Sequence, residues 1–204
     1  MKKDISKFKK SGVGFTLIEV MVSVAIFSLL IAGPTGFFIS SLKAQKKALS
    51  SQELVDTASY FLEYASRAIR MAQKEKNMGS PNVCLTVSGN GANYEITEGP
   101  GIKFINYKGE CQKIYLEVIE NINSRRLKEW RRDLNGVEKT GYLTSVNLEV
   151  VDFKIKLSGG VQSDNLQPKV TIFLNMRGKS QVEEMRPEIN IQTTISQRNL
   201  DVEQ

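Results

Sequence analysis

The chain has 204 residues, of which 41% are hydrophobic and 25% are charged. Apart from one N-terminal apolar stretch, this length suits a single modest domain, and the composition excludes disordered and fibrous classes. Histidine is absent, which excludes Ser-His-Asp and Cys-His nucleophiles and every histidine-ligated metal site. Two cysteines are too few for an all-cysteine zinc site or an iron–sulfur cluster. We therefore expect no metal, no cofactor and no enzymatic activity.

The net charge of +6 is concentrated at the N-terminus. Residues 1–14 contain five lysines and one aspartate, which gives +4. The other 190 residues carry 23 basic and 21 acidic side chains, a balance of only +2. The basic character therefore belongs to a short leader and not to a domain adapted to bind polyanions.

A long apolar segment follows this leader, from Phe15 to Ile39, and Glu19 is its only charged residue. As a helix it spans roughly 37 Å, which is enough to cross the roughly 30 Å hydrocarbon core of a bilayer. The lysines before the segment are denser than those after it. We therefore expect the N-terminus in the cytoplasm and the C-terminal domain outside.

The residues around this segment differ from those of a secretory signal peptide. Such a signal has small residues and a cleavage site after its apolar region, whereas here Gly12 and Gly14 precede it. A carboxylate as deep in a membrane as Glu19 costs a few kcal/mol, and such groups usually have a function. The sequence GFTLIE at residues 14–19, between a basic leader and a long apolar run, resembles the class III signal of type IV pilins and type II secretion pseudopilins.

The resemblance implies that a prepilin peptidase removes the leader 1–14 by cutting between Gly14 and Phe15, and then methylates the amino group of Phe15. It also implies a structural subunit, a minor pilin or minor pseudopilin, that assembles with other subunits through its N-terminal helix. Glu19 of one subunit would then meet Phe15 of its neighbour. Residues 15–39 would lie in membrane lipid before assembly and in a cell-surface filament afterwards. A membrane-tethered module that binds a ligand or DNA is the alternative.

The helical pattern continues beyond the apolar segment. Small and apolar residues recur every three, four or six positions and form one stripe, which consists of Leu49, Val55, Ala58, Leu62, Ala65, Ile69 and Ala72. This predicts an amphipathic helix over residues 40–78. We expect the helix to end at Asn77, because Gly79 and Pro81 follow.

Pro34 interrupts the apolar run and lies between Gly33 and Gly36. It lacks the N–H group that would bond to the carbonyl of Leu30, so we expect a kink or an unwound turn there. The alternative is a tolerated proline without a role.

Residues 79–204 have the pattern of a β-rich extracytoplasmic domain, with period-two alternation and Gly and Pro clusters between the runs. Short strands are predicted at Asn82–Ser88, Asn93–Thr97, Gly101–Tyr107 and Gln112–Ile119. Longer strands are predicted at Ser145–Leu157, Lys169–Met176 and Glu188–Ser196. These three should form an antiparallel sheet on the helix between Val55 and Ala72. The expected fold is α+β and pilin-like, a long N-terminal helix packed against a C-terminal antiparallel sheet.

Cys84 and Cys111 are 27 residues apart, and both follow the apolar segment. Thiols outside the cytoplasm usually pair, and closing this loop would stabilise the fold by about 3.5 kcal/mol. We expect a disulfide, and two buried reduced cysteines are the alternative. Many major pilins carry a disulfide near the C-terminus instead, so this position favours a minor subunit.

Trp130 lies among five basic residues, which are Arg125, Arg126, Lys128, Arg131 and Arg132. Arginines beside an aromatic ring can bind a nucleic acid strand. Because Glu120, Glu129 and Asp133 offset the charge, we favour a solvated surface and do not expect nucleic acid as a partner. No group of carboxylates has the spacing of a calcium-binding loop.

Overall fold

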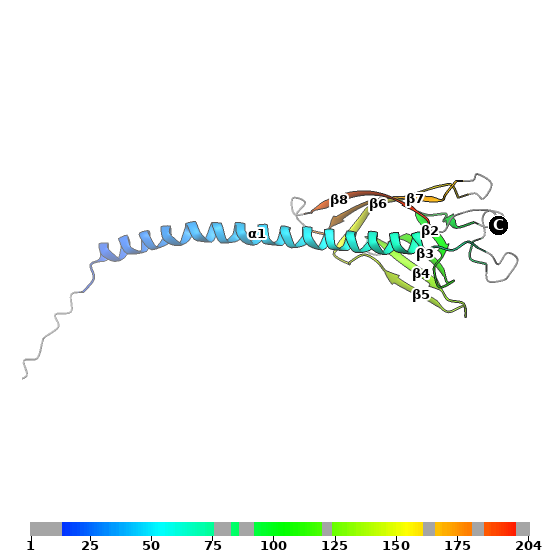
Figure 1. Ribbon diagram of the computed structural model, residues 1–204. Helices are drawn as coiled ribbons and strands as arrows, with labels where there is room; N and C mark the ends of the chain where they lie inside the picture. The colour runs from blue at the N-terminus through cyan, green and yellow to red at the C-terminus, as the bar shows by residue number, and fades with distance from the viewer. Residues whose placement is uncertain are drawn as a thin grey trace, which may run out of the picture. The chain divides into compact units, whose positions relative to one another are not determined.

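The computed structural model describes residues 14–75, 83–85, 92–119, 124–160, 166–180 and 186–198. These residues form one long helix, α1 (Leu17–Arg70), and eight strands in two antiparallel sheets (Figure 1). The α+β class expected from the sequence is confirmed.

The first sheet has the order β1-β2-β3-β4-β5 and the second the order β6-β7-β8. The strands of the first sheet are β1 (Tyr94–Ile96), β2 (Gly101–Ile105), β3 (Cys111–Ile119), β4 (Ser124–Arg132) and β5 (Glu138–Tyr142). Those of the second are β6 (Leu148–Ser158), β7 (Lys169–Gly178) and β8 (Glu188–Ser196). In Figure 1, β5 and β8 lie to opposite sides of α1.

The chain divides into two compact units, an N-terminal unit of residues 1–45 and a globular unit of residues 46–204. The core residues among those described all lie in the globular unit. Part of α1 contributes a buried stripe to this core, which consists of Leu54, Ala58, Phe61, Ala65 and Ile69. The Phe61 ring meets the Phe153 ring of β6 edge-on, with centroids 6.1 Å apart. This contact joins the helix to the three-stranded sheet.

The predicted helical stripe is partly wrong. Ala58, Ala65, Ile69 and Ala72 are buried as the stripe requires, but Leu49 and Val55 are exposed. Leu49 is five residues before Leu54, a rotation of about 500°, so it lies on the face away from the stripe, and Val55 lies about 100° to one side of Leu54. The buried stripe instead begins at Leu54 and continues through Phe61 in steps of three and four residues.

Helix α1 ends at Arg70 and not at the predicted Asn77. Groups distant in the sequence bond to its last carbonyls and so end it early. The Tyr94 hydroxyl donates to the Ile69 carbonyl at 2.7 Å, and the Arg198 N–H donates to the Arg70 carbonyl at 2.8 Å. Gln73 then forms an isolated bridge with Ile105. The helix predicted over residues 40–78 is therefore too long at its C-terminal end.

The second sheet is the antiparallel sheet that the sequence predicts, and β7 pairs with both neighbours along its length. The first sheet was predicted only in part, since β4 and β5 were missed. The strand expected at Asn82–Ser88 is not present over residues 83–85, and the rest of it lies outside the described residues. Residues 83–85 bond to side chains and not to a neighbouring strand, as described below.

Candidate processing and assembly site

The predicted processing site precedes helix α1. Gly14, Phe15 and Thr16 are not helical, and the helix begins at Leu17. Phe15 is 81% exposed, and a Cβ added to Gly14 would have nothing within 4 Å. The peptide bond between Gly14 and Phe15 therefore lies in an open segment with no regular structure, where a protease can reach it.

Thr16 caps the helix. Its carbonyl accepts the Val20 N–H at 3.2 Å, and its hydroxyl oxygen accepts the Glu19 N–H at 3.4 Å. Thr16 is thus the N-cap and Glu19 the third helical residue, which is the Thr-x-x-Glu spacing of a capping box. The sequence interpretation of Glu19 as an assembly residue missed this second feature, although the spacing of Thr16 and Glu19 shows it. A carboxylate in the first turn also interacts favourably with the helix dipole.

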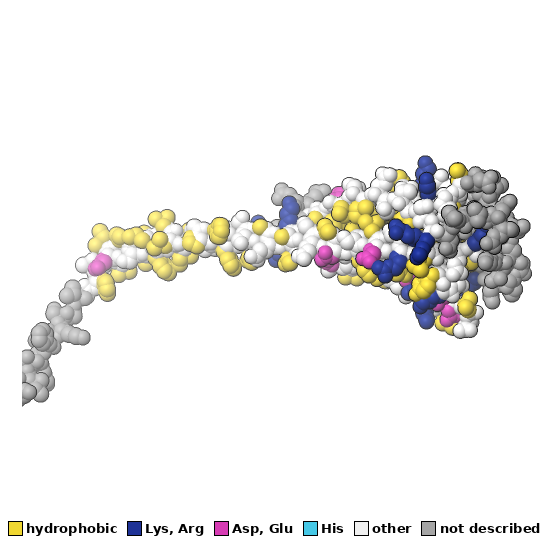
Figure 2. Space-filling model, in the orientation of Figure 1, with side chains coloured by type: hydrophobic (Ala, Val, Ile, Leu, Met, Phe, Trp, Pro, Cys, Tyr) yellow, Lys and Arg dark blue, Asp and Glu magenta, His cyan; other side chains and the backbone are white. Residues whose placement is uncertain are grey.

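The first part of α1 exposes apolar side chains on all sides, and no residue from 14 to 40 is buried. Figure 2 shows hydrophobic side chains along this part and an acidic group near its start. The hydroxyls of Ser23, Ser28 and Thr35 donate to carbonyls four residues earlier, at 2.7, 2.8 and 2.8 Å. These polar groups are therefore satisfied within the helix, as a bilayer requires.

Helical geometry continues through Gly33, Pro34 and Gly36. The unwound turn considered from the sequence is therefore not present. The donation of the Thr35 hydroxyl to the Ile31 carbonyl adds a bond in the turn where the proline lacks its N–H. A bend at this place stays a prediction.

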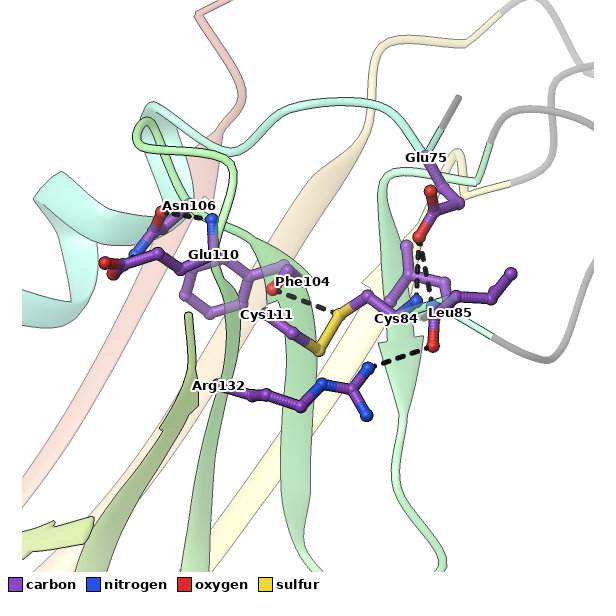
Figure 3. Close-up of a disulfide and its surroundings, with 9 residues drawn as sticks. Glu75, Cys84, Leu85, Phe104, Asn106, Glu110, Cys111 and Arg132 are labelled. Atoms are coloured by element: carbon purple, nitrogen blue, oxygen red, sulfur yellow. Dashed lines mark hydrogen bonds between the residues drawn. A yellow bond between two sulfur atoms is a disulfide. The ribbon is translucent and has the colours of Figure 1, made fainter. Parts of the chain in front are cut away.

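The predicted disulfide between Cys84 and Cys111 is present, with Cα atoms 5.5 Å apart, and both residues are buried (Figure 3). The buried Glu75 carboxylate accepts the N–H groups of Cys84 at 3.0 Å and Leu85 at 3.4 Å. The Arg132 guanidinium donates to the Val83 carbonyl at 3.2 Å. Residues 83–85 are thus fixed by a covalent bond and by charged side chains, and the shielded disulfide is structural.

Three of the five basic residues around Trp130 contact carbonyl oxygens of the same chain. Arg125 donates to Val151, Arg126 to Thr144 and Arg132 to Val83. The other two form ion pairs, Lys128 with Glu117 at 2.6 Å and Arg131 with Glu129 at 3.1 Å.

The three acidic residues that the sequence interpretation set against these cations have different roles. Glu129 is an ion-pair partner, whereas Asp133 accepts the N–H groups of Asn135 and Val137, each at 2.9 Å. Glu120 lies outside the described residues. All five cations of the basic cluster therefore have partners within the same chain.

One helix in the described part of the chain, α1, is long and apolar enough to cross a membrane. Residues 14–33 match the family model of the prokaryotic N-terminal methylation motif. The chain carries a type IV pilin-like prepilin signal. No curated protein and no solved structure matches the chain.

The prepilin signal implies processing by a prepilin peptidase and assembly with other pilins, and it points to a structural subunit. Together with the apolar helix it fits a single-pass membrane protein. Over the described residues, no group of three or more Cys, Asp or Glu side chains is placed to hold a metal ion.

Proposed function

We propose that this protein is a minor subunit of a type IV pilus or a type II secretion-like filament. Its leader 1–14 is removed at the bond between Gly14 and Phe15, and Phe15 is then methylated. One observation supports this proposal most. The matched motif contains an exposed Gly14–Phe15 peptide bond, a helix start capped by Thr16 and the carboxylate of Glu19.

The exposed apolar surface supports assembly through the helix. Residues 15–39 are solvated by lipid while the subunit is in the membrane. Outside the bilayer the same side chains would face water, and burying a Phe, Leu or Ile side chain gains about 1.5–3 kcal/mol. Packing against the helices of neighbouring subunits recovers this free energy, so we propose that residues 15–39 form the filament core.

Glu19 supplies the polar contact in this packing. An unpaired carboxylate in apolar surroundings costs several kcal/mol, and cleavage creates a cation, the amino group of Phe15. We propose that Glu19 of an incoming subunit pairs with Phe15 of its neighbour, which neutralises both charges and sets the axial register.

The disulfide supports the proposed orientation. Cys84 and Cys111 are bonded, and disulfides persist on the oxidising side of a membrane. The dense lysines of the leader favour a cytoplasmic N-terminus. We therefore place the globular unit outside the cytoplasmic membrane and, after assembly, on the filament.

Substituting Gly14→Leu tests the processing step. The uncut precursor should accumulate in membranes, because a side chain next to the scissile bond obstructs the peptidase. Immunoblots with and without the peptidase should differ by about 1.6 kDa for the wild type, the share of fourteen residues in a 22.9 kDa chain. Gly12→Leu, at the other leader glycine, is the matched control and should be cut normally. Normal cleavage of Gly14→Leu would place the processing site elsewhere.

Substituting Glu19→Val tests the assembly step. The variant should be inserted and cleaved, but its fraction in sheared filaments should fall about tenfold, which corresponds to about 1.4 kcal/mol. Glu19→Asp should be intermediate because its side chain is one carbon shorter. The control is Glu63→Val, which removes an exposed carboxylate from the globular part of α1. Wild-type incorporation of Glu19→Val would disprove the proposed pairing.

A further inference from the structure

The outward face of the five-stranded sheet carries a hollow of about 590 Å³ that has no part in the N-terminal signal. The opposite face of this sheet contributes Ile102, Phe104, Ile114 and Leu127 to the core. Residues that alternate with these point outward and line the hollow. The lining contains two aromatic rings, two lysines and two glutamates.

The aromatic rings belong to Tyr115 and Trp130. They lie on adjacent strands as diagonal neighbours, since Lys113 is opposite Trp130 and Tyr115 is opposite Lys128. The indole N–H of Trp130 donates to Glu138 at 3.0 Å, which fixes its ring. Across β2, a Cβ on Gly101 would lie 2.7 Å from the Tyr115 Cβ, so only glycine leaves room for Tyr115. The chain thus holds both rings in defined positions.

Lys103 and Lys113 lie directly opposite each other in the β2–β3 ladder. Like charges in such a pair destabilise a sheet. Neither lysine forms an ion pair within the described residues, and the Lys113 ammonium lies 4.5 Å from the centroid of the Tyr115 ring. Glu95 lies opposite Lys103 on β1 and offsets part of this repulsion, whereas the residues opposite Lys113 are Lys103 and Trp130. A ligand carboxylate between the two ammonium groups would relieve the rest.

The glutamates Glu95 and Glu98 in the same hollow determine which anion fits. A nucleic acid strand carries a charge at every phosphate and would be repelled by these carboxylates. A peptide could not bond to the backbone of this face, because strand backbones pair within the sheet plane. Sugar hydroxyls both donate and accept hydrogen bonds, so they can use lysines and glutamates together.

We propose that this hollow binds an acidic oligosaccharide. A sugar carboxylate lies between Lys103 and Lys113, and the C–H faces of the rings lie against Trp130 and Tyr115, where the negative π face attracts them. Hydroxyls of the neighbouring rings donate to Glu95 and Glu98. This binding activity does not depend on the proposed role in a filament.

Trp130 is the only tryptophan of the chain, so intrinsic fluorescence reports directly from the hollow. We would titrate the full chain in detergent micelles with tetragalacturonate, a hyaluronan hexasaccharide and 3′-sialyllactose. At least one should change the Trp130 emission in a saturable way. The methyl ester of that probe, which lacks the charge, should bind at least about fivefold more weakly. Absence of a response to all three sugars would overturn the proposal.

The double variant Lys103→Gln/Lys113→Gln tests the placement of the carboxylate. It should bind the responding sugar at least about tenfold more weakly, while its melting curve shows that it is folded. Lys156→Gln, at an exposed lysine of β6, is the matched control and should bind normally. Undiminished binding by the double variant would overturn the proposal. The proposal would also be overturned if a ten-residue oligothymidylate bound more tightly than the sugar and lost this binding in the double variant. The ligand of the hollow would then be a nucleic acid.

Discussion

The two compact units use the same residue type in opposite ways. Phe27 and Phe61 lie on one helix, but Phe27 is 63% exposed and Phe61 is 0% exposed. Around Phe27 apolar residues occupy every side of the helix, whereas around Phe61 they form one stripe. An apolar stripe on one side of a helix indicates that this side packs against another surface, and here the sheets of the same chain provide that surface. A fully apolar circumference indicates surroundings that the chain itself does not provide.

The strongest test of this difference is a pair of matched truncations. Phe61→Ala should destabilise the globular unit by about 3–5 kcal/mol, because it leaves a cavity in the core. Phe27→Ala should leave the unfolding of that unit unchanged. The free energy of unfolding of each variant is measured by denaturant titration in detergent, with Trp130 fluorescence as the signal. Equal losses of stability would mean that the two parts of the helix are not independent.

The disulfide provides the second test. The double variant Cys84→Ala/Cys111→Ala should unfold with a free energy about 3.5 kcal/mol lower, because the unfolded chain is no longer closed into a loop. Membrane insertion and removal of the leader should not change, since both depend on the N-terminal unit. Labelling of free thiols in denatured, unreduced wild-type protein should give no signal. Two labels per chain would show that the cysteines are reduced.

The smallest effect is expected at the ion pair of Glu117 with Lys128. The hydrogen bond from Lys128 lowers the pKa of Glu117 below its ordinary value of 4.5. The pair therefore stabilises the folded state above about that pH, and the contribution is lost as the pH falls and Glu117 is protonated. We expect no more than about 1 kcal/mol, because the pair is partly exposed.

Unfolding curves of the wild type and Glu117→Gln measure this contribution. The two stabilities should differ most between pH 6 and 8, above the ordinary pKa of 4.5, and converge below it. A difference that stays constant down to pH 3 would assign the effect to packing and not to charge.

Strand β4 explains why the first sheet was only partly predictable. Its sequence contains charged residues on both faces, so the alternation that identifies a strand is hidden. The inward Glu129 is only 6% exposed, and it accepts bonds from Gln112 at 2.6 Å and from the Tyr64 hydroxyl. Burial and this carboxylate raise the pKa of Tyr64 well above its usual range. These partners are 17 and 65 residues away from Glu129, and no local pattern connects them.

The N-terminal signal was predictable for the opposite reason. Gly14, Phe15 and Glu19 lie within six residues of one another, and their spacing alone identifies the motif. The C-terminal end of α1 was not predictable, because hydrogen bonds from Tyr94 and Arg198, which are distant in the sequence, determine where it ends. Local sequence therefore predicts the features that act locally, and tertiary contacts determine the boundaries.

The hydroxyl groups of the apolar helix bond to its own backbone, and this affects how two such helices meet along their length. Between Leu17 and Ile39, Ser23, Ser28 and Thr35 are bonded to their own backbone, which leaves Glu19 as the one charged group. In the proposed packing, apolar side chains form the contact along two such helices, and the carboxylate supplies its one charged group. Under the proposed pairing of Glu19 with Phe15, subunits with unrelated globular units would stop at the same axial step, provided that each carries its carboxylate at the same height.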